Sequence, residues 1–262
     1  MTMRVLALGD IFGRPGRKLI ETKAAYIKRE VNADFVIANI ENASAGKGVS
    51  EANAKDLLKV EAIDMFTSGN HIWDKKDVNN LLQESDRIIR PANYPEPCTG
   101  KGYGIYRVGK KRIGVVNLSG NVYMNNLDNP FTVFDRIYQN IQSVCDIIIV
   151  DFHAEATSEK IAFGYYVSTR ATAVYGTHTH VPTADERILD KHTGFITDIG
   201  MCGPLDGVIG VDKNIIIKNF VTQRPVKHEV AEGPVQLNGV VFEFDDETNK
   251  CISVERVRKI FE

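Results

Sequence analysis

The sequence predicts an α/β protein that forms one domain with two β-sheets. Short β-branched runs alternate with amphipathic stretches over the first two thirds of the chain, and the remainder is rich in strand patterns. No linker, charge run or internal repeat divides the 262 residues, a length that can bury a substantial core. The alternation of strands and helices favours a largely parallel sheet with helices on both faces.

The strands expected in the first two thirds are short apolar runs that end at glycine, proline or polar residues. They cover residues 4–8, 35–40, 63–67, 103–108, 112–118, 145–150, 171–175 and 194–197. Gly109-Lys110-Lys111 joins two of these runs and predicts a hairpin.

Helices are expected between these strands, and further strands at the end of the chain. The helical stretches run from the turn at residues 13–16 to about residue 31, and over 51–60, 74–83 and 131–144. The β-rich end predicts strands over 226–230, 236–244 and 252–257. This end supplies either a second sheet of the core or a subunit contact, so a homo-oligomer stays open.

The composition excludes several classes of protein. A net charge of -2 without a basic block argues against a binder of long nucleic acid, and 43% apolar residues argue against disorder. The four cysteines are far apart and form no C-x-x-C pair, so neither a zinc knuckle nor a disulfide framework is expected. The apolar runs at 1–9 and 147–150 are too short for a signal peptide or a spanning helix, which needs about 20 residues. We therefore expect a cytoplasmic protein with reduced thiols and no membrane partner.

Polar side chains follow five of the predicted strands at their carboxyl ends, where α/β proteins bind ligands. These residues are Asp10, Glu41, Asn42, Asn70, His153, His178 and His180. Asp10, Glu41, Asn42, Asn70 and His153 are each typical, taken alone, of a turn, a helix cap or a hydrogen-bonded core residue, whereas the spacing of His178 and His180 already favours a metal site. Five strand ends that all carry oxygen or imidazole ligands favour a divalent-metal site.

The number of candidates predicts two ions rather than one. In extended backbone, His178 and His180 would point to the same side and approach one ion or two adjacent ions. Seven side chains exceed what one ion takes, whereas two ions about 3.5–4 Å apart, bridged by one carboxylate, use them all. Two divalent cations against Asp10 and Glu41 leave excess positive charge, which suits a phosphate ester.

Competing chemistries lack their motifs. Gly9, Gly13 and Gly16 do not have the G-x-G-x-x-G spacing of a dinucleotide site, and Gly46-Lys47-Gly48 is not a P-loop. The chain also has no G-x-S-x-G nucleophile elbow.

Two motifs resemble those of the calcineurin-like metallophosphoesterases: Gly69-Asn70-His71 matches G-N-H, and residues 176–180 match G-x-H-x-H. Over essentially its whole length, the chain is similar to the bacterial YmdB family of cyclic-nucleotide phosphodiesterases. The specific matches are at 9–13, 41–43, 69–76, 90–93, 151–160 and 176–181. The resemblance implies a four-layer α-β-β-α sandwich with two mixed sheets over residues 1–262.

The chain departs from the broad superfamily at two motifs. Phe12 replaces the histidine of D-x-H, and Glu41-Asn42 replaces the usual Gly-Asp. Both changes fit the YmdB-like subgroup, and the harder ligand set favours iron or manganese over zinc. The resemblance implies that Glu41 bridges two ions. The other ligands implied are Asp10, Asn42 and His180 for one ion, and Asn70, His153 and His178 for the other.

The predicted mechanism is attack on phosphorus by a hydroxide that bridges the two metals. His71 would be the catalytic residue that protonates the leaving oxygen or stabilises the phosphate, as the resemblance also implies. Asp74 either orients His71 or, as the favoured interpretation, is a carboxylate at a helix N-terminus.

Three functions stay open for a small phosphate-ester substrate. The favoured one is hydrolysis of 2′,3′- or 3′,5′-cyclic AMP or GMP. The second is a phosphomonoesterase or protein phosphatase on the same centre, and the third is a non-catalytic scaffold, which the retention of all seven ligands disfavours.

Four charged residues stay ambiguous. Lys47, Arg90 and Lys101 are candidate phosphate or ribose contacts, but solvated surface charge is the favoured interpretation for each. Asp198 follows another strand and fits a support for a metal ligand as well as it fits a turn.

Overall fold

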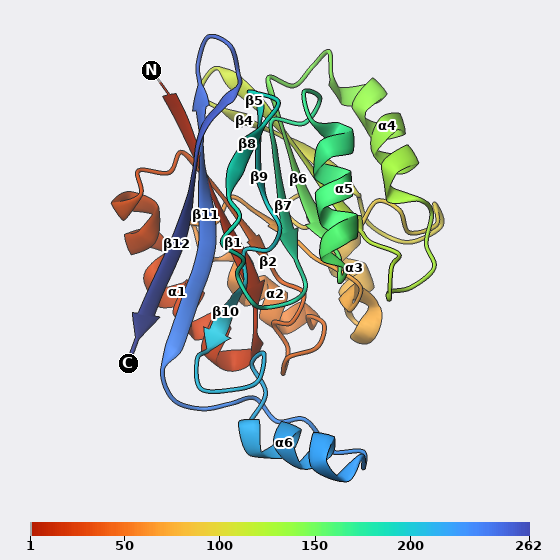
Figure 1. Ribbon diagram of the computed structural model, residues 1–262, viewed down its shortest axis with the longest axis vertical. Coiled ribbons are helices and arrows are strands. Elements are labelled where there is room, and N and C mark those ends of the chain that lie inside the picture. Colours follow the sequence, from red (N-terminus) through yellow and green to blue (C-terminus); the bar gives the residue numbers. More distant parts are fainter. Residues whose placement is uncertain (1) are drawn as a thin grey trace.

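Two six-stranded sheets pack face to face in the computed structural model, which describes residues 2–262 (Figure 1). The first sheet has the order β12-β11-β10-β1-β2-β3. Its strands are β1 (Thr2–Ile11), β2 (Phe35–Asn39), β3 (Met65–Thr67), β10 (Met201–Pro204), β11 (Val235–Asp245) and β12 (Cys251–Phe261). Strands β1, β2, β3 and β10 are parallel, whereas β11 and β12 are antiparallel to their neighbours, so the sheet is mixed.

The second sheet is also mixed and has the order β4-β5-β6-β7-β9-β8. Its strands are β4 (Tyr103–Val108), β5 (Lys111–Ser119), β6 (Ile147–His153), β7 (Ala173–Thr177), β8 (Arg187–Leu189) and β9 (Thr193–Ile196). The four strands β5, β6, β7 and β9 are parallel, and the antiparallel strands β4 and β8 form the edges.

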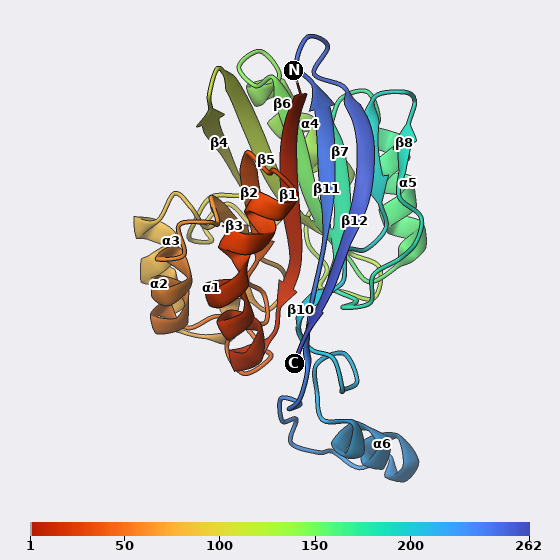
Figure 2. The same ribbon diagram turned by 90° about the vertical axis from the view of Figure 1, so that its left-hand side faces the viewer.

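Helices cover the outer face of each sheet (Figure 2). Over the first sheet lie α1 (Gly13–Glu30), α2 (Glu51–Leu58) and α3 (Val78–Glu84), preceded by the short 3₁₀ helix η1 (Ile72–Asp74). Over the second lie α4 (Pro130–Ile141) and α5 (Thr157–Val167). The last helix, α6 (Lys213–Thr222), extends away from both sheets.

The alternation of side chains along each strand builds these layers. In β1, Leu6 and Leu8 join the core layer of α1 to α3, whereas Val5 and Ala7 face the second sheet. Successive strand side chains point to opposite faces, so one buried strand serves two core layers. The predicted four-layer sandwich with two mixed sheets is confirmed.

Several elements differ from the sequence prediction. The predicted strand at 226–230 is wrong: this segment is mostly exposed and makes only an isolated bridge between Val211 and Val230. β10, which was not predicted, lies between β1 and β11. Helices α5 and α6 and strand β8 were not predicted either, and the helix expected at 74–83 begins only at Val78.

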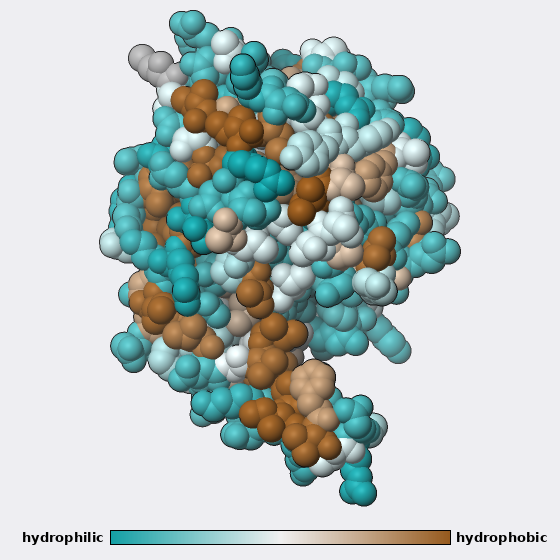
Figure 3. Space-filling view, in the orientation of Figure 1, coloured by the Kyte–Doolittle hydropathy of each residue, from teal (hydrophilic) through white to brown (hydrophobic). Residues whose placement is uncertain are grey.

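α6 is poorly covered by the rest of the chain. Only Ile216 of this helix is buried. Figure 3 shows apolar side chains along it, and Ile217, Phe220 and Val221 are exposed by 55%, 69% and 77%. Within residues 2–262, no helix has the length and apolar character needed to span a membrane.

Candidate metal centre

The carboxyl ends of parallel strands from both sheets meet at one edge of the sandwich. Buried side chains link the two sheets there: Asn39 Nδ2 at the end of β2 donates to Asp151 Oδ2 in β6 at 3.0 Å. Thr67 Oγ1 at the end of β3 donates to the same carboxylate at 2.5 Å. These bonds fix the sheets against each other at the point where the predicted ligands lie.

One group of candidates consists of Asp10, Asn42 and His180. His180 Nε2 lies 2.8 Å from Asn42 Nδ2 and 3.6 Å from Asp10 Oδ2. His180 Nδ1–H donates to the carbonyl oxygen of Ile209 at 2.9 Å, so Nε2 carries the lone pair of the ring. Rotation of the Asn42 amide would present its oxygen at the same place.

A second group consists of Asn70, His153 and His178. His153 Nε2 lies 3.1 Å from Asn70 Oδ1 and 3.1 Å from His178 Nδ1. The ring of His153 fits here because position 69 is glycine, where a Cβ would lie 2.2 Å from His153 Nε2. This contact gives the physical reason for the glycine of the G-N-H motif.

Hydrogen bonds on the far side of each ring determine which nitrogen has the free lone pair. His153 Nδ1–H donates to Thr177 Oγ1 at 2.9 Å, and that hydroxyl donates to Asp151 Oδ1 at 2.7 Å. His178 Nε2 lies 3.2 Å from Glu155 Oε2, and this carboxylate favours the tautomer with the proton on Nε2. Both rings therefore direct unprotonated nitrogens toward each other and toward Asn70 Oδ1, an arrangement of lone pairs that suits a cation.

Glu41 lies between the two groups. Its Oε1 accepts from the backbone N–H of His71 at 2.6 Å and lies 3.5 Å from His153 Nε2. Within residues 2–262, Glu41 Oε2 and Asp10 Oδ1 are buried and accept no hydrogen bond. Two unpartnered carboxylate oxygens in a fully buried site cost free energy unless a positive charge compensates them.

Burial shifts the protonation equilibria of the carboxyl groups and imidazoles in this site toward their neutral forms. Burial raises the pKa of Glu41 to about 7, partly opposed by His71, and raises the pKa of Asp10 well above its usual value. It lowers the pKa values of His153, His178 and His180, which keeps the rings neutral, the form in which imidazole binds metals.

Within residues 2–262, no three His, Cys, Asp or Glu side chains are gathered tightly enough to form a ligand set by themselves. The two groups consist instead of histidines and one aspartate with amide side chains, and Glu41 lies between them. The described site therefore brings together all seven predicted residues, and its donor chemistry fits divalent cations.

The backbone of the histidine pair differs from the sequence expectation. His178 and His180 were expected in extended backbone with both rings on one side, but their φ angles are +100° and +66°. The loop turns between them, so His178 contacts His153 while His180 contacts Asn42. The expectation of an extended segment was wrong, because β7 ends at Thr177.

His71 lies beside the two groups and belongs to neither. Its Nδ1–H donates to Asp74 Oδ2 at 2.8 Å, and Lys47 Nζ lies 3.3 Å from the same carboxylate oxygen. Asp74 lies in the first turn of the short helix η1, and its carboxylate also accepts from His71, so the structure is compatible with both interpretations of this residue. Lys47, expected to be solvated, pairs with Asp74, although its side chain is 63% exposed.

The other ambiguous cations have structural partners. Arg90 was expected at the surface, but it is only 6% exposed, and its guanidinium donates to the carbonyl oxygens of Pro91, Cys98 and Thr99. Lys101 pairs with Asp86 at the surface. Neither residue contacts the seven candidates.

Sequence reasoning left Thr177, Asp151 and Glu155 without roles, although they hold the rings of His153 and His178. The available signal was their position inside the matched segments 151–160 and 176–181.

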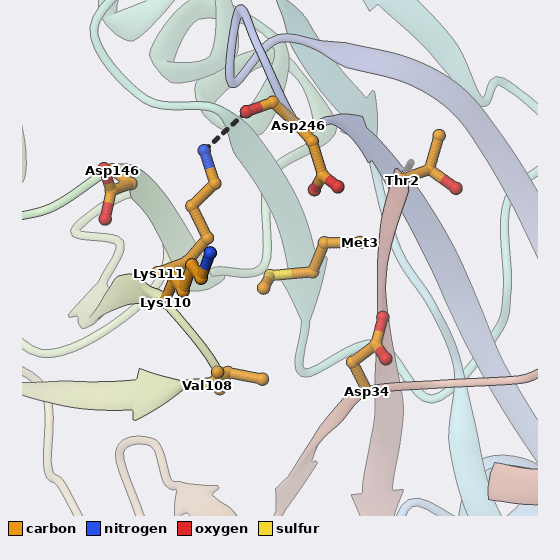
Figure 4. A pocket seen from close by; sticks show the side chains of 9 residues that line it. Thr2, Met3, Asp34, Val108, Lys110, Lys111, Asp146 and Asp246 are labelled. Carbon is orange, nitrogen blue, oxygen red and sulfur yellow. Dashed lines mark hydrogen bonds between the residues drawn. The ribbon is translucent and has the colours of Figure 1, made fainter.

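A separate pocket of about 610 Å³ lies at the opposite edge of the sandwich, where Lys111 donates to the carbonyl oxygen of Asp246 (Figure 4). Strand β1 runs from Thr2 in this pocket to Asp10, a distance of about 26 Å at about 3.3 Å per residue. The pocket is thus remote from the candidate centre. A smaller pocket of about 310 Å³ borders His180 itself.

The chain is similar to known proteins over nearly its whole length. The family model of YmdB-like proteins matches residues 6–257. A 2′,3′-cyclic-nucleotide 2′-phosphodiesterase of Bacillus subtilis is 45% identical over 255 residues, which cover 97% of this chain and 96% of that protein. The crystal structure of a novel phosphatase from Mycoplasma pneumoniae is 37% identical with a TM-score of 0.92, and the match covers 99% of this chain and 94% of the other.

A more distant likeness extends the fold comparison. A Staphylococcus aureus structure, described as a candidate 5′-nucleotidase, has a TM-score of 0.62 at 16% identity, covering 98% of this chain and 54% of the other. At this identity the likeness shows the shared sandwich fold alone.

Proposed function

Because this chain belongs to the YmdB-like protein family, we propose that it is a phosphodiesterase that hydrolyses 2′,3′-cyclic nucleotides at a centre of two divalent cations. The observation that carries the proposal is the pair of buried, unpartnered oxygens, Asp10 Oδ1 and Glu41 Oε2, beside three neutral imidazoles. Such a site is electrostatically incomplete without cations. Phosphoesterase chemistry is common to the named relatives, and the cyclic-nucleotide substrate comes from one of them.

The geometry supports one division of the ligands between the ions. Asp10, Asn42 and His180 would hold one ion, since His180 Nε2 lies close to the side chains of the other two. The other would be held by Asn70, His153 and His178. Glu41 would bridge them, and a set rich in carboxylate and amide oxygens favours iron or manganese over zinc.

The bound ions would supply an activated water and neutralise the phosphate charge. The protein's own contribution to the second half of the reaction is His71. Asp74 accepts the Nδ1–H of this ring and so leaves Nε2 to serve the substrate. When the ring is doubly protonated, the Nε2 proton would pass to the ribose O2′ as the bond between O2′ and phosphorus breaks, which leaves a 3′-nucleotide and a neutral His71.

The test is a parallel assay of the purified, Mn²⁺-loaded protein on 2′,3′-cyclic AMP, 3′,5′-cyclic AMP and p-nitrophenyl phosphate. We expect the 2′,3′-cyclic substrate to be hydrolysed fastest, with 3′-AMP as the product. Faster turnover of p-nitrophenyl phosphate would favour the phosphomonoesterase alternative. No turnover of any ester, with two ions bound per chain, would contradict the proposal and leave the scaffold alternative.

A further inference from the structure

A buried ion pair lies directly behind the loop that carries two of the candidate imidazole ligands. Lys160 Nζ in α5 lies 2.6 Å from Asp198 Oδ2, and each side chain is only 1% exposed. Lys160 reaches Asp198 past Gly176, where a Cβ would lie 2.9 Å from Lys160 Cδ and 1.9 Å from the carbonyl oxygen of Thr197. The glycine of the G-x-H-x-H motif thus makes room for this pair.

The Asp198 carboxylate is bonded to both sides of the candidate centre. Its Oδ2 accepts from the backbone N–H of Thr179 at 3.2 Å and from Thr179 Oγ1 at 2.7 Å. Its Oδ1 accepts from the N–H of Gly200 at 2.8 Å, and the Gly200 carbonyl oxygen accepts from the N–H of Asp10 at 3.1 Å. One carboxylate therefore connects the loop at 177–180 to the end of β1.

The loop needs such a restraint because its backbone is strained. His178 and His180 both have positive φ, a conformation that residues other than glycine keep only where the surroundings determine it. Thr179 lies between them and is held by two bonds to Asp198. Thr179 is thus the point at which Asp198 can restrain the backbone of both histidines.

We propose that the Lys160–Asp198 pair is a positioning device that holds Thr179 so that His178 and His180 face different metal ions. This inference rests on the proposed metal centre. Lys160 and Asp198 make no side-chain hydrogen bond to a candidate ligand, and their bonds reach these ligands through Thr179 of the loop and through Gly200. A merely structural pair would stabilise the fold without changing the affinity of the site for metal.

The experiment compares Mn²⁺ affinity with thermal stability in full-length protein, after chelation and reloading. Lys160→Met removes the cation and should weaken Mn²⁺ binding about 10-fold or more, the range found for residues that orient metal ligands. Thr179→Val removes one bond to Asp198 at a partly exposed position, so it should fold and still weaken binding several-fold.

The control is Lys28→Met, the same substitution in a lysine–aspartate pair that is remote from the centre and whose side chains are more exposed, at 26% and 31%. Lys28 Nζ lies 3.0 Å from Asp64 Oδ2, and this carboxylate accepts a backbone N–H from Val36, near the amino end of β2. The control should lower the melting temperature while Mn²⁺ affinity stays that of the wild type.

Two results separate the possible failures. Wild-type affinity in both Lys160→Met and Thr179→Val, with normal binding by the unchanged protein, would overturn the positioning role alone. Absence of Mn²⁺ binding by the unchanged protein would overturn the proposed function and this inference with it. If Lys160→Met does not fold, Thr179→Val decides the question.

Discussion

At the scale of single residues, His71 and His178 have separable roles. His71 donates to Asp74 and contacts neither group of candidate ligands, whereas His178 Nδ1 lies 3.1 Å from His153 Nε2. The first histidine is therefore available for proton transfer and the second for metal binding.

The substitution His71→Ala should keep both metal ions and reduce kcat on 2′,3′-cyclic AMP by about 10²-fold or more, the usual contribution of a general acid. The measurement is steady-state kinetics together with elemental analysis of the same sample. A kcat close to that of the wild type would contradict the assigned role.

The substitution His178→Ala should lower the metal content as well as the turnover, because it removes one of three side chains around the same point. Elemental analysis of the purified protein measures this loss. His192→Ala is the control, since His192 contacts Thr193 far from the centre and should keep the full metal content. Two ions per chain in His178→Ala would show that this ligand assignment is wrong.

The candidate residues could be predicted from the sequence because they lie at the ends of strands. Buried strands are recognisable as apolar runs, so their ends can be located in the sequence. The conformation of the loop at 177–180 could not be predicted, because a buried carboxylate 19 residues after Thr179 determines it. The sequence also left both interpretations of Asp74 open, because its bond to His71 depends on a 3₁₀ turn that begins at Ile72. The metal-binding roles of the seven residues stay predictions.

At the scale of elements, α5 and α6 differ in how firmly they are packed. Phe163 of α5 is fully buried against Phe131, Phe134 and Phe152. Phe220 of α6 is 69% exposed. Neither helix was predicted. α5 belongs to the core layer of the second sheet, whereas α6 contributes Ile216 to a small cluster with Phe12, Met201 and Val211.

This difference in packing predicts that a phenylalanine-to-alanine substitution destabilises the protein more in α5 than in α6. Phe163→Ala should lower the free energy of unfolding by about 3–5 kcal/mol, because it leaves a cavity among aromatic rings. Phe220→Ala should change it by less than about 0.5 kcal/mol in dilute monomer. Urea denaturation followed by circular dichroism measures both. A large loss in Phe220→Ala would mean that α6 is covered in solution.

The long strands were predictable and the irregular segments were not. β1, β6 and β11 each contain an apolar run, at residues 5–8, 147–150 and 240–242, and each run lies within a strand of the structure. α6 was missed because Ile215-Ile216-Ile217 lacks the polar face that marks an amphipathic helix. The segment at 226–230 has valine at each end and three polar residues between them, and β10 already has β1 and β11 as neighbours, so no sheet edge is open to it there.

At the scale of the whole molecule, the two sheets share one inner core layer, to which both contribute side chains. The single domain over residues 1–262 stays a prediction. Stability of the sandwich should depend on the metal centre, because burial of Asp10 and Glu41 without cations is costly.

Removal of metal by a chelator should lower the melting temperature, and Mn²⁺ should restore it. At a free Mn²⁺ concentration of 100 times its Kd, one site adds about 2.7 kcal/mol to the free energy of unfolding. Differential scanning fluorimetry over a Mn²⁺ series measures the shift, with Mg²⁺ as a control for ionic strength. A melting temperature that is independent of Mn²⁺ would contradict the proposed centre.

The two sheets supply chemically different candidate ligands. Every oxygen or amide ligand follows a strand of the first sheet: Asp10, Glu41, Asn42 and Asn70. Every imidazole comes from the second sheet: His153, His178 and His180. During synthesis, the oxygen half of the site is complete by residue 70, more than eighty residues before the first candidate imidazole ligand, His153, is made. An ion that needs both kinds of donor can bind only after the two sheets have packed against each other. Metal binding during folding would therefore mark the last stage in the formation of the sandwich.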